Sequence, residues 1–361
     1  MPTDVLIAGG GLAAQRVAET LRARGFDGPI RIVCGEPVRP YDRPPLSKAL
    51  LAGELDDPSF RPPSWYAEHD VELLLGTRAT AVEDRRLRLD DGRALRFGEL
   101  VVATGGRARR IPGSLVLRTL DDAWALRERL VAGARLTVVG AGFVGLEVAA
   151  TARGLGAEVT VVEALEAPML RILPAPIGHW FADLHREHGV RMELGARVEA
   201  AQLARSADVV LAAIGSEPAA AWLGFPGGVP VDGLGRTALP HVWAAGDVAL
   251  APGRCDHWEP AARQAAAVAR AILDQPVAAP PPAAAWTDQY GLRVNVLGHG
   301  AGADDVEIDG DLAARDFAAE LRRDGRLTGV LLAGRPHDLP HWRRRLAAAA
   351  AGITEPERTA A

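Results

Sequence analysis

The chain has 361 residues, of which 48% are hydrophobic and 24% charged, as in an ordinary globular protein of two or three domains. No stretch of about 18 residues lacks a charge, which excludes a membrane span, and the net charge of −5 gives no reason to expect nucleic-acid binding. An apolar pattern begins after Asp4 and the only cysteines are Cys34 and Cys255, so we expect a cytoplasmic protein without signal peptide, disulfides or metal site.

Residues 5–14 form the first nucleotide-binding pattern. A short β-branched strand leads through Gly9, Gly11 and Ala14 into an alanine-rich helical pattern. The first glycine permits a tight bend, the second lets the backbone approach a diphosphate, and a small third residue lets helix and strand pack closely. The next strand pattern ends at Glu36, where an acid can hold ribose hydroxyls.

The same pattern returns with Gly140, Gly142 and Gly145, and the strand after it ends at Glu163. One such motif is weak evidence, because tight strand-to-helix turns without a ligand are common. Two complete units predict two dinucleotide sites and therefore two cofactors. The carboxylate of Glu163 would repel a 2′-phosphate, which favours NADH over NADPH at the second site, and Arg171 eight residues later weakens that preference.

Further segments carry a resemblance to a known family. They are 41–48 (Tyr-Asp-Arg-Pro-Pro-Leu-Ser-Lys), 100–112, 117–123, 242–247 and 286–290. On these segments the chain resembles the ferredoxin/rubredoxin reductase family of FAD-dependent pyridine nucleotide oxidoreductases, in order and over nearly its whole length. The resemblance implies an α/β fold with two Rossmann-like dinucleotide-binding domains, for FAD and NAD, and a small C-terminal α+β domain.

The NAD-binding domain is expected to be inserted in the FAD-binding domain. The predicted boundaries are 1–112 and 233–283 for the FAD-binding domain, 113–232 for the NAD-binding domain and 284–361 for the C-terminal domain. The Ala-Pro run 277–285 is predicted to be a stiff linker, and a helical pattern spans 339–351. Basic residues at 341–345 are interpreted as a solvated helix face or a docking patch for an acidic partner, with 107–110 and 85–88 as competing clusters.

The resemblance also implies cofactor contacts. For tightly but non-covalently bound FAD they are Gly9, Gly11, Leu12, Ala13, Ala14, Glu36, Arg43, Lys48, Ala81, Thr104, Gly105, Arg118, Gly246, Asp247, Glu259 and Trp286. For NADH they are Gly140, Gly142, Phe143, Val144, Gly145, Glu147, Glu163, Arg171, Ile214 and Gly215. Two of these residues have alternative interpretations, Asp247 as a helix N-cap and Trp286 as part of an interface core.

Lys48 and Glu147 are the candidate catalytic residues. Lys48 is the only lysine beside 40 arginines, and a compact ammonium suits a flavin edge better than a flat guanidinium. We expect Glu147 in the first turn of the helix after Gly145, where a carboxylate gains from the helix dipole but otherwise faces apolar groups. The resemblance pairs these residues at the nicotinamide–flavin contact. The alternative for Lys48 is a chance solvated lysine.

The thiols indicate how electrons leave. Relatives that reduce disulfides or peroxides carry a cysteine beside the flavin. In the NADH peroxidases and oxidases that resemble this chain, it stands just after the serine at the position of Ser47, where this chain has Lys48. Cys34 is predicted to be a small buried hydrophobe, and Cys255 lies alone in a loop after the Gly-Asp motif. We therefore expect single-electron transfer from a monomer or homodimer to a ferredoxin-like protein, with a cytochrome P450 or a dioxygenase as the candidate enzymes that it serves. The alternatives are an NADH oxidase or peroxidase, direct reduction of a small organic substrate, and a redox-sensing flavoprotein.

Overall fold

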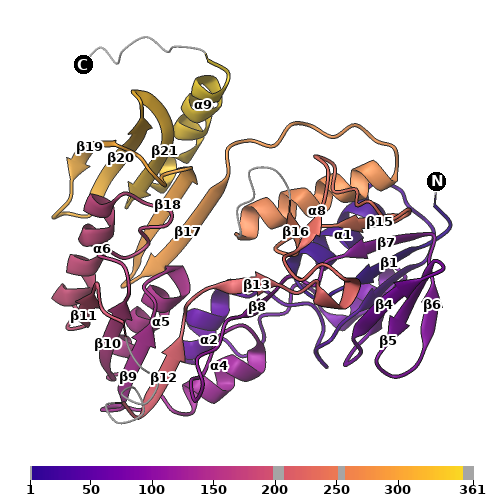
Figure 1. Ribbon diagram of the computed structural model, residues 1–361, viewed down its shortest axis with the longest axis horizontal. Coiled ribbons are helices and arrows are strands. Elements are labelled where there is room, and N and C mark those ends of the chain that lie inside the picture. The colour runs from indigo at the N-terminus through magenta and orange to yellow at the C-terminus, as the bar shows by residue number, and fades with distance from the viewer. Residues whose placement is uncertain (1, 198–206, 251–256, 353–361) are drawn as a thin grey trace. The chain divides into compact units, whose positions relative to one another are not determined.

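Figure 1 shows the computed structural model, which describes residues 2–197, 207–250 and 257–352. By their contacts these residues form two compact units. Unit 1 is drawn from Met1–Arg43, Asp57–Arg107 and Ser216–Pro280, and unit 2 from Pro44–Asp56, Ala108–Gly215 and Pro281–Ala361. No helix within the described ranges is long and apolar enough to cross a bilayer.

A five-stranded parallel sheet forms the middle of unit 1. Its strands, in spatial order, are β15 (Val242–Ala244), β7 (Glu99–Val102), β1 (Val5–Ala8), β2 (Ile30–Val33) and β3 (Val71–Leu74). Successive side chains on a strand point to opposite faces, so β1 contributes to two cores. Val5 and Ile7 pack with one set of buried residues, whereas Leu6 and Ala8 pack with another.

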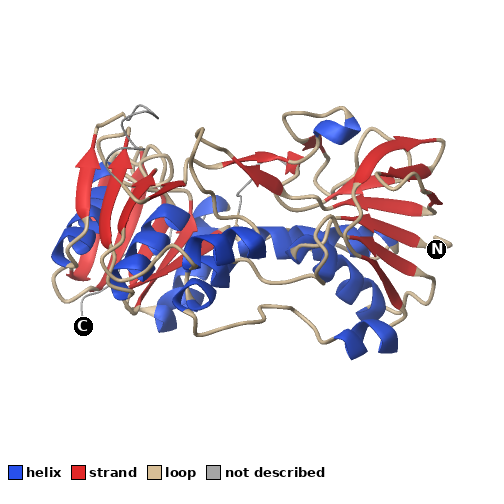
Figure 2. Ribbon diagram, turned by 90° about the horizontal axis from the view of Figure 1, so that it is seen from below, coloured by secondary structure: helices blue, strands red, loops and turns tan. Residues whose placement is uncertain are grey.

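Helices cover one face of this sheet and strands cover the other. The Val5 side packs against α1 (Leu12–Ala23) and α8 (Trp258–Ile272), which lie side by side in Figure 1. The Leu6 side packs against an antiparallel sheet of β4 (Ala79–Glu83), β5 (Arg86–Leu89) and β6 (Ala94–Arg96). Figure 2 distinguishes these helices from the strands by colour. Burial on both faces explains why β1, β7 and β15 are almost continuously apolar.

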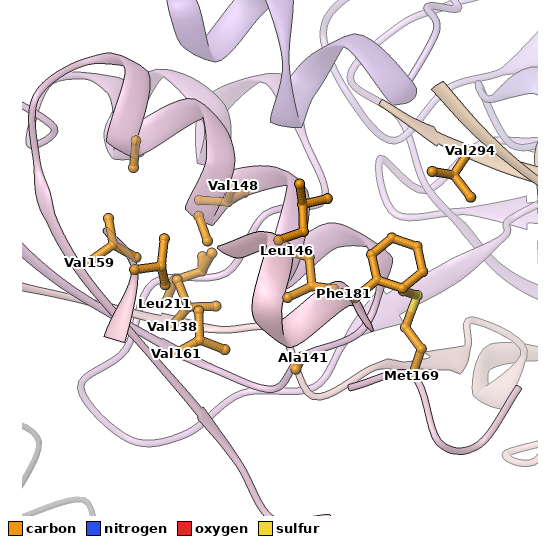
Figure 3. Packing of buried hydrophobic residues seen from close by; sticks show 14 of the residues in the cluster. Val138, Ala141, Leu146, Val148, Val159, Val161, Met169, Phe181, Leu211 and Val294 are labelled. Atoms are coloured by element: carbon orange, nitrogen blue, oxygen red, sulfur yellow. The ribbon is translucent and has the colours of Figure 1, made fainter. Parts of the chain in front are cut away.

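Unit 2 contains a four-stranded parallel sheet. Its strands, in spatial order, are β11 (Arg191–Leu194), β10 (Glu158–Glu163), β9 (Arg135–Val139) and β12 (Val209–Ala212). The helices of this part are α5 (Phe143–Gly154), α6 (Ala175–Glu187), α4 (Leu120–Arg127) and α2 (Ala49–Ala52), which follows the 3-10 helix η1 (Pro44–Ser47). Figure 3 shows Val138, Val161 and Leu211 from this sheet in one core with Leu146 and Val148 of α5.

The C-terminal part of unit 2 is an antiparallel sheet. Its strands, in spatial order, are β17 (Ala284–Gln289), β18 (Leu292–Gly298), β21 (Arg326–Ala333), β20 (Asp316–Arg323) and β19 (Asp305–Asp311). One face packs against α9 (Leu339–Ala350) through Trp342 and Leu346. The other face joins the core of the parallel sheet, where Val294 lies near Phe181 of α6 (Figure 3).

Short elements complete the described chain: α3 (Pro63–Glu68), β8 (Gly106–Ala108) paired with β13 (Ser216–Pro218), β14 (Val229–Pro230) paired with β16 (Ala249–Leu250), and the 3-10 helices η2 (Ala221–Leu223) and η3 (Pro336–Asp338).

These sheets confirm the predicted mixed α/β class with two Rossmann-like folds and a C-terminal α+β fold. The helix predicted over 339–351 is confirmed as α9, but the predicted linker 277–285 is too long, because β17 already begins at Ala284. The shared core groups the antiparallel sheet with the parallel sheet of unit 2, and contacts place residues 216–232 in unit 1. The three-domain division with its boundaries therefore stays a prediction.

Candidate functional site

Three predicted FAD segments meet at one edge of the unit 1 sheet. Gly9, Thr104 and Gly246 follow the carboxyl ends of β1, β7 and β15, which are neighbours in the sheet. The ladder continues past the strands, since the N–H of Ala103 donates to the carbonyl of Ala8 at 2.7 Å. A Cβ built on Gly246 would lie 3.1 Å from that of Ala13 in α1. Nucleotides bind at this edge in doubly wound sheets, where the strand order reverses beside β1.

The glycines of the first turn have two different roles. Gly9 has a φ of +131°, and a Cβ there would lie 2.1 Å from the carbonyl oxygen of Ala103, so no side chain fits. Gly11 is the N-cap of α1 and has no side-chain cap, and a Cβ there would meet nothing within 4 Å. An uncapped helix N-terminus with open space in front of it fits a diphosphate.

Glu36, the acid that follows the first glycine turn, is held by side chains of the loop after it. The hydroxyl of Tyr41 donates to Glu36 at 2.7 Å, and the guanidinium of Arg43 lies 3.3 Å from the other carboxylate oxygen. Two partners on separate oxygens fix the orientation of the carboxylate, which lies three residues beyond Val33, the last residue of β2. This placement fits an acid that accepts ribose hydroxyls.

The remaining unit 1 residues predicted for FAD occupy varied positions. Asp247 lies in the turn between β15 and β16, and α8 begins at Trp258 with His257 as its N-cap, so the N-cap interpretation of Asp247 is wrong. Glu259 stands in the first turn of α8 and pairs with Arg263. A larger set is placed without a distinctive contact: Leu12 in the first turn of α1, Ala81 in β4, and Gly105, whose carbonyl accepts from Ala219.

The glycine turn of unit 2, at 140–145, repeats the geometry of the turn at 9–14 in unit 1. Each of these turns is called a cradle below. Gly140 has a φ of +104°, and a Cβ there would lie 2.5 Å from the carbonyl oxygen of Ala213, so here too no side chain fits. Gly142 is the uncapped N-cap of α5 with nothing within 4 Å of a built Cβ. The third positions differ, because a Cβ on Gly145 would meet the oxygen of Gly140 at 2.1 Å, whereas Ala14 is accommodated in the first cradle.

Glu163 fixes the second turn through backbone hydrogen bonds. One carboxylate oxygen accepts from the N–H of Ala141 at 2.7 Å and the other from the N–H of Leu165 at 2.9 Å. The carbonyl of Ala141 accepts in turn from Met169 at 3.0 Å. The other residues predicted for NADH lie around this edge: Phe143 and Val144 in the first turn of α5, Ile214 and Gly215 after β12, and Arg171 on the loop before α6.

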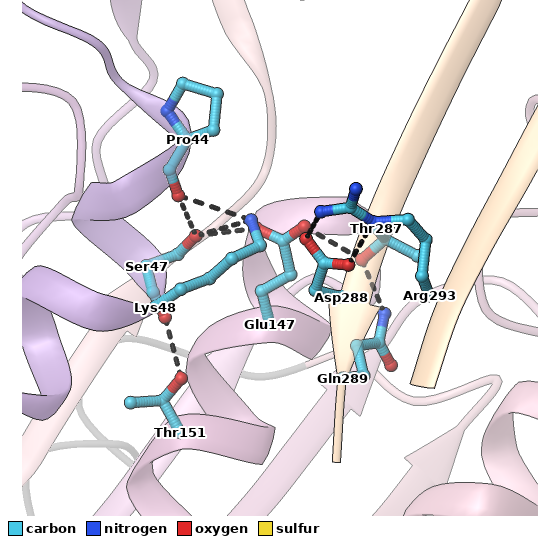
Figure 4. A network of polar contacts seen from close by, with 9 residues as sticks. All are labelled: Pro44, Ser47, Lys48, Glu147, Thr151, Thr287, Asp288, Gln289 and Arg293. Atoms are coloured by element: carbon cyan, nitrogen blue, oxygen red, sulfur yellow. Dashed lines mark hydrogen bonds and ion pairs between the residues drawn. The ribbon is translucent and has the colours of Figure 1, made fainter. Parts of the chain in front are cut away.

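Lys48 and Glu147 form an ion pair inside unit 2, as Figure 4 shows. The Lys48 ammonium nitrogen lies 2.6 Å from Oε2 of Glu147, and the two side chains are 20% and 6% exposed. The Ser47 hydroxyl donates to Oε2 at 2.6 Å, and the Thr287 hydroxyl donates to Oε1 at 2.8 Å. Both carboxylate oxygens are therefore held, each from a different element.

The predicted surroundings of Glu147 need a correction. Helix α5 begins at Phe143, so Glu147 is the fifth helical residue and lies beyond the first turn. The helix dipole acts mainly within that turn, and polar partners rather than apolar groups surround the carboxylate. The predicted pairing with Lys48 is present, which excludes a solvated lysine without a partner.

Two partners of Glu147 carry no predicted role. Ser47 lies within the quoted segment 41–48, and its carbonyl accepts from Thr151 of α5 at 2.8 Å. Thr287 follows Trp286 on β17, where burial alternates so that Ala285, Thr287 and Gln289 face inward. Polar residues at period two on the buried face of a strand are the signal that identifies this site.

Two predicted FAD residues of unit 2 remain without a tested role. Trp286 is half-buried on β17, and Arg118 directly precedes Thr119, the N-cap of α4. The backbone N–H of Arg118 donates to Asp122 at 3.0 Å.

Cys34 has the properties of a buried hydrophobe, as predicted. It is 1% exposed, and burial together with the charge of Glu36 raises the pKa of its thiol to about 12. Such a thiol is not an active redox group at neutral pH. Cys255 lies outside the described residues.

His185 of α6 is fully buried behind the Glu147 site. Burial lowers the pKa of its imidazole from 6.5 to about 4, and the groups that face it are Gln289, Tyr290 and His188. Because the unfolded chain takes up this proton first, the stabilisation is complete above pH 6.5 and is lost as the pH falls toward 4, by roughly 3 kcal/mol.

We therefore expect urea unfolding of the flavin-loaded protein to show a lower free energy at pH 5 than at pH 7. Replacing His185 by glutamine should flatten the part of this dependence that lies between pH 4 and 6.5. An identical pH dependence in both proteins would contradict the assignment to His185.

Two sheet-edge turns of this kind, each followed by an acid, are typical of a protein that binds two dinucleotides. Residues 3–265 match the family model described as pyridine nucleotide-disulphide oxidoreductase, and residues 285–359 match the model described as reductase C-terminal. The chain belongs to the pyridine nucleotide-disulphide oxidoreductase family.

Named relatives extend over the whole chain. The ferredoxin reductase component of chlorobenzene dioxygenase from Cupriavidus sp. (strain PS12) is 38% identical, over 100% of this chain and 96% of the relative. Putidaredoxin reductase from Pseudomonas putida is 36% identical, over 92% and 89% of the two chains. The crystal structure of the covalent putidaredoxin reductase–putidaredoxin complex matches with a TM-score of 0.90 at 30% identity, covering 97% of this chain and 99% of that one.

These matches confirm the predicted family and the predicted class of enzyme, an oxidoreductase of the ferredoxin–NAD⁺ reductase type. FAD and NAD(H) are the cofactors that the family and the names of its members imply.

Proposed function

We propose that this chain oxidises NADH, holds FAD tightly without a covalent bond, and passes electrons singly to a ferredoxin-type iron–sulfur protein. The observation that carries the proposal is the pair of matching cradles at Gly9 and Gly140, each followed by a fixed acid. The relatives named as ferredoxin reductase components support the choice of acceptor. One NADH carries two electrons, so it reduces two molecules of a one-electron acceptor.

Residues of both cradles fit the two cofactors. In unit 1, Gly11 leaves room for the FAD diphosphate at the N-terminus of α1, and Glu36 would hold the adenosine ribose. In unit 2, Gly142 and Glu163 would do the same for NADH. FAD supplies the capacity to take two electrons as a hydride and to release them one at a time.

Lys48 and Glu147 orient charge near the reacting rings in this proposal. The ammonium of Lys48, whose side chain is 20% exposed, would stabilise negative charge that develops at the flavin edge. The more deeply buried carboxylate of Glu147 keeps that ammonium in place. A buried ion pair contributes little to stability, so a role in catalysis explains its presence better than a role in folding.

The kind of electron acceptor is inferred from the thiol of Cys34. Because the pKa of Cys34 is raised to about 12, its thiol cannot relay electrons to a disulfide or a peroxide. Direct transfer to a one-electron acceptor needs no such relay.

The preference for NADH depends on Glu163 in this proposal. Its carboxylate is fixed by two backbone N–H groups, so it cannot turn away from a 2′-phosphate. We expect Glu163→Gln to raise the kcat/KM ratio of NADPH to NADH about tenfold, because about 1.4 kcal/mol of repulsion is relieved. Steady-state rates with both nucleotides measure this ratio, and Glu158→Gln, at the exposed start of β10, is the matched control.

The function is tested by comparing electron acceptors. The flavin-loaded protein is mixed with NADH and cytochrome c, with and without ferredoxins of the same organism, and NADH consumption is compared with that under oxygen alone. We expect ferredoxin to accelerate cytochrome c reduction at least tenfold. Equal NADH consumption with oxygen alone would favour an oxidase, and slow turnover with every acceptor would favour a redox sensor.

A further inference from the structure

A chain of hydrogen bonds runs from Glu147 into the interior of unit 2. The amide nitrogen of Gln289 lies 3.0 Å from the Thr287 hydroxyl, and its amide oxygen lies 2.8 Å from Nε2 of His185. The Tyr290 hydroxyl lies 2.8 Å from Nδ1 of His185. Thr287 and His185 are fully buried, and Gln289 is 2% exposed. The chain joins α5, β17 and α6, and Figure 4 shows its first links.

The donors in this chain all point toward Glu147. As the ionised partner of Lys48, Glu147 only accepts, so the Thr287 hydroxyl donates to it and accepts from the Gln289 amide. The Gln289 carbonyl then accepts from Nε2–H of His185, which leaves Nδ1 of His185 to accept from Tyr290. One tautomer of His185 satisfies every contact. Hydrogen bonds aligned in this way polarise one another in a low dielectric, and those to a charged acceptor are the strongest.

The chain restricts the rotation of the Glu147 carboxylate. Lys48 and Ser47 hold Oε2 from the η1 segment, whereas Thr287 holds Oε1 from β17. Two oxygens held from two elements leave the carboxylate a single orientation. Apolar residues of similar volume at 287 and 289 would fill the same space without polar groups to satisfy, so packing alone does not explain a threonine and a glutamine here.

We propose that Thr287, Gln289 and His185 are positioning residues, which hold Glu147 in the orientation that keeps Lys48 productive for reduction of the flavin by NADH. This inference rests on the proposed function of the Lys48–Glu147 pair. It assigns a catalytic consequence to the C-terminal sheet, since β17 supplies the donor that fixes Oε1.

The test compares Thr287→Val with Thr287→Ser. Valine keeps the shape but removes the donor, whereas serine retains it. In anaerobic stopped-flow experiments we expect NADH to reduce the flavin of the valine variant about tenfold more slowly, with an NADH KM within about twofold of wild type, and serine to restore the rate. Gln289→Leu, which breaks the next link, should slow the step about threefold.

A second readout does not depend on turnover. The long-wavelength absorbance of nicotinamide stacked on reduced flavin should weaken by roughly half in the valine variant and recover with serine. Asp288→Asn is the matched control, because Asp288 lies on the same strand but pairs with Arg293 at 2.7 Å. Urea unfolding of each variant establishes whether it is folded at the assay temperature.

The outcomes separate the two proposals. If NADH does not reduce the flavin of the wild-type protein, the proposed function fails. If wild type is reduced but Thr287→Val reacts at the same rate with the same absorbance, the positioning role alone is overturned. A serine variant as slow as the valine variant would also overturn it, because the hydroxyl would then have no part in the effect.

Discussion

Replacing Lys48 with alanine is expected to slow reduction of the bound flavin by NADH about 100-fold and to leave the flavin in place. A preorganised charged donor near developing charge contributes on the order of 100-fold to a rate. In unit 1 the proposed FAD contacts at Gly11 and Glu36 do not involve Lys48, so flavin retention should not depend on it. Stopped-flow absorbance under anaerobic conditions measures the rate, and the protein-bound flavin spectrum measures retention.

The stability of the alanine variant should fall by about 2–3 kcal/mol. Removing one partner of a fully buried pair costs more, but one fifth of the Lys48 side chain is exposed, and Ser47 and Thr287 still donate to Glu147. Lys48→Arg is the control that keeps the charge. We expect it to recover less than a tenth of the lost rate, since a planar guanidinium does not reproduce the compact contact. Reduction of the alanine variant at the wild-type rate would remove Lys48 from the mechanism.

Replacing Gly9 with alanine is expected to prevent formation of the first cradle. The new Cβ would lie 2.1 Å from the Ala103 carbonyl oxygen and 2.4 Å from its carbon, and alanine strongly disfavours the φ of +131°. Because both contacts are backbone atoms of the residue that directly follows β7, the edge of the sheet itself must move. We expect a loss of about 4 kcal/mol or more in the free energy of unfolding and a colourless purified protein.

Gly11→Ala is the matched control for that variant. The φ of Gly11 is −102°, and its built Cβ meets nothing, so the flavin-free protein should be as stable as wild type. If the diphosphate approaches this position, flavin binding should weaken by at least tenfold all the same. Measured flavin content and urea unfolding of both variants therefore distinguish a folding defect from a binding defect. A fully yellow, stable Gly9→Ala protein would contradict the geometry of the turn.

Local sequence patterns predicted the parts of the fold that depend on local rules. The two strand–glycine–helix units appear where Gly9 and Gly140 stand, because a tight turn under a close neighbouring strand needs a residue without Cβ at a particular spacing. The last helix appeared within one residue of its predicted end, because its periodicity is regular. The cofactor contacts within these units remain predictions from the family resemblance.

Local sequence patterns could not predict which residues hydrogen-bond to Glu147. Ser47 and Thr287 lie 100 and 140 residues away in the chain, so only the tertiary fold brings them to one carboxylate. The first turn of α5 was also misjudged, since the helix begins at Phe143, which places Glu147 beyond that turn. A pattern of glycines locates the bend well and the first helical residue poorly.

The buried thiol of Cys34, which packs against the turn at Gly10, can be used to detect movement of that turn away from the sheet of unit 1. A Cβ on Gly10 would lie 2.7 Å from the sulfur of Cys34, so the turn and the thiol are packed against each other. In a Cys255→Ser background, alkylation of Cys34 should therefore proceed only when the turn lifts from the sheet. Its rate, followed by mass spectrometry with and without added FAD, would measure how often the cradle opens and how strongly the cofactor closes it.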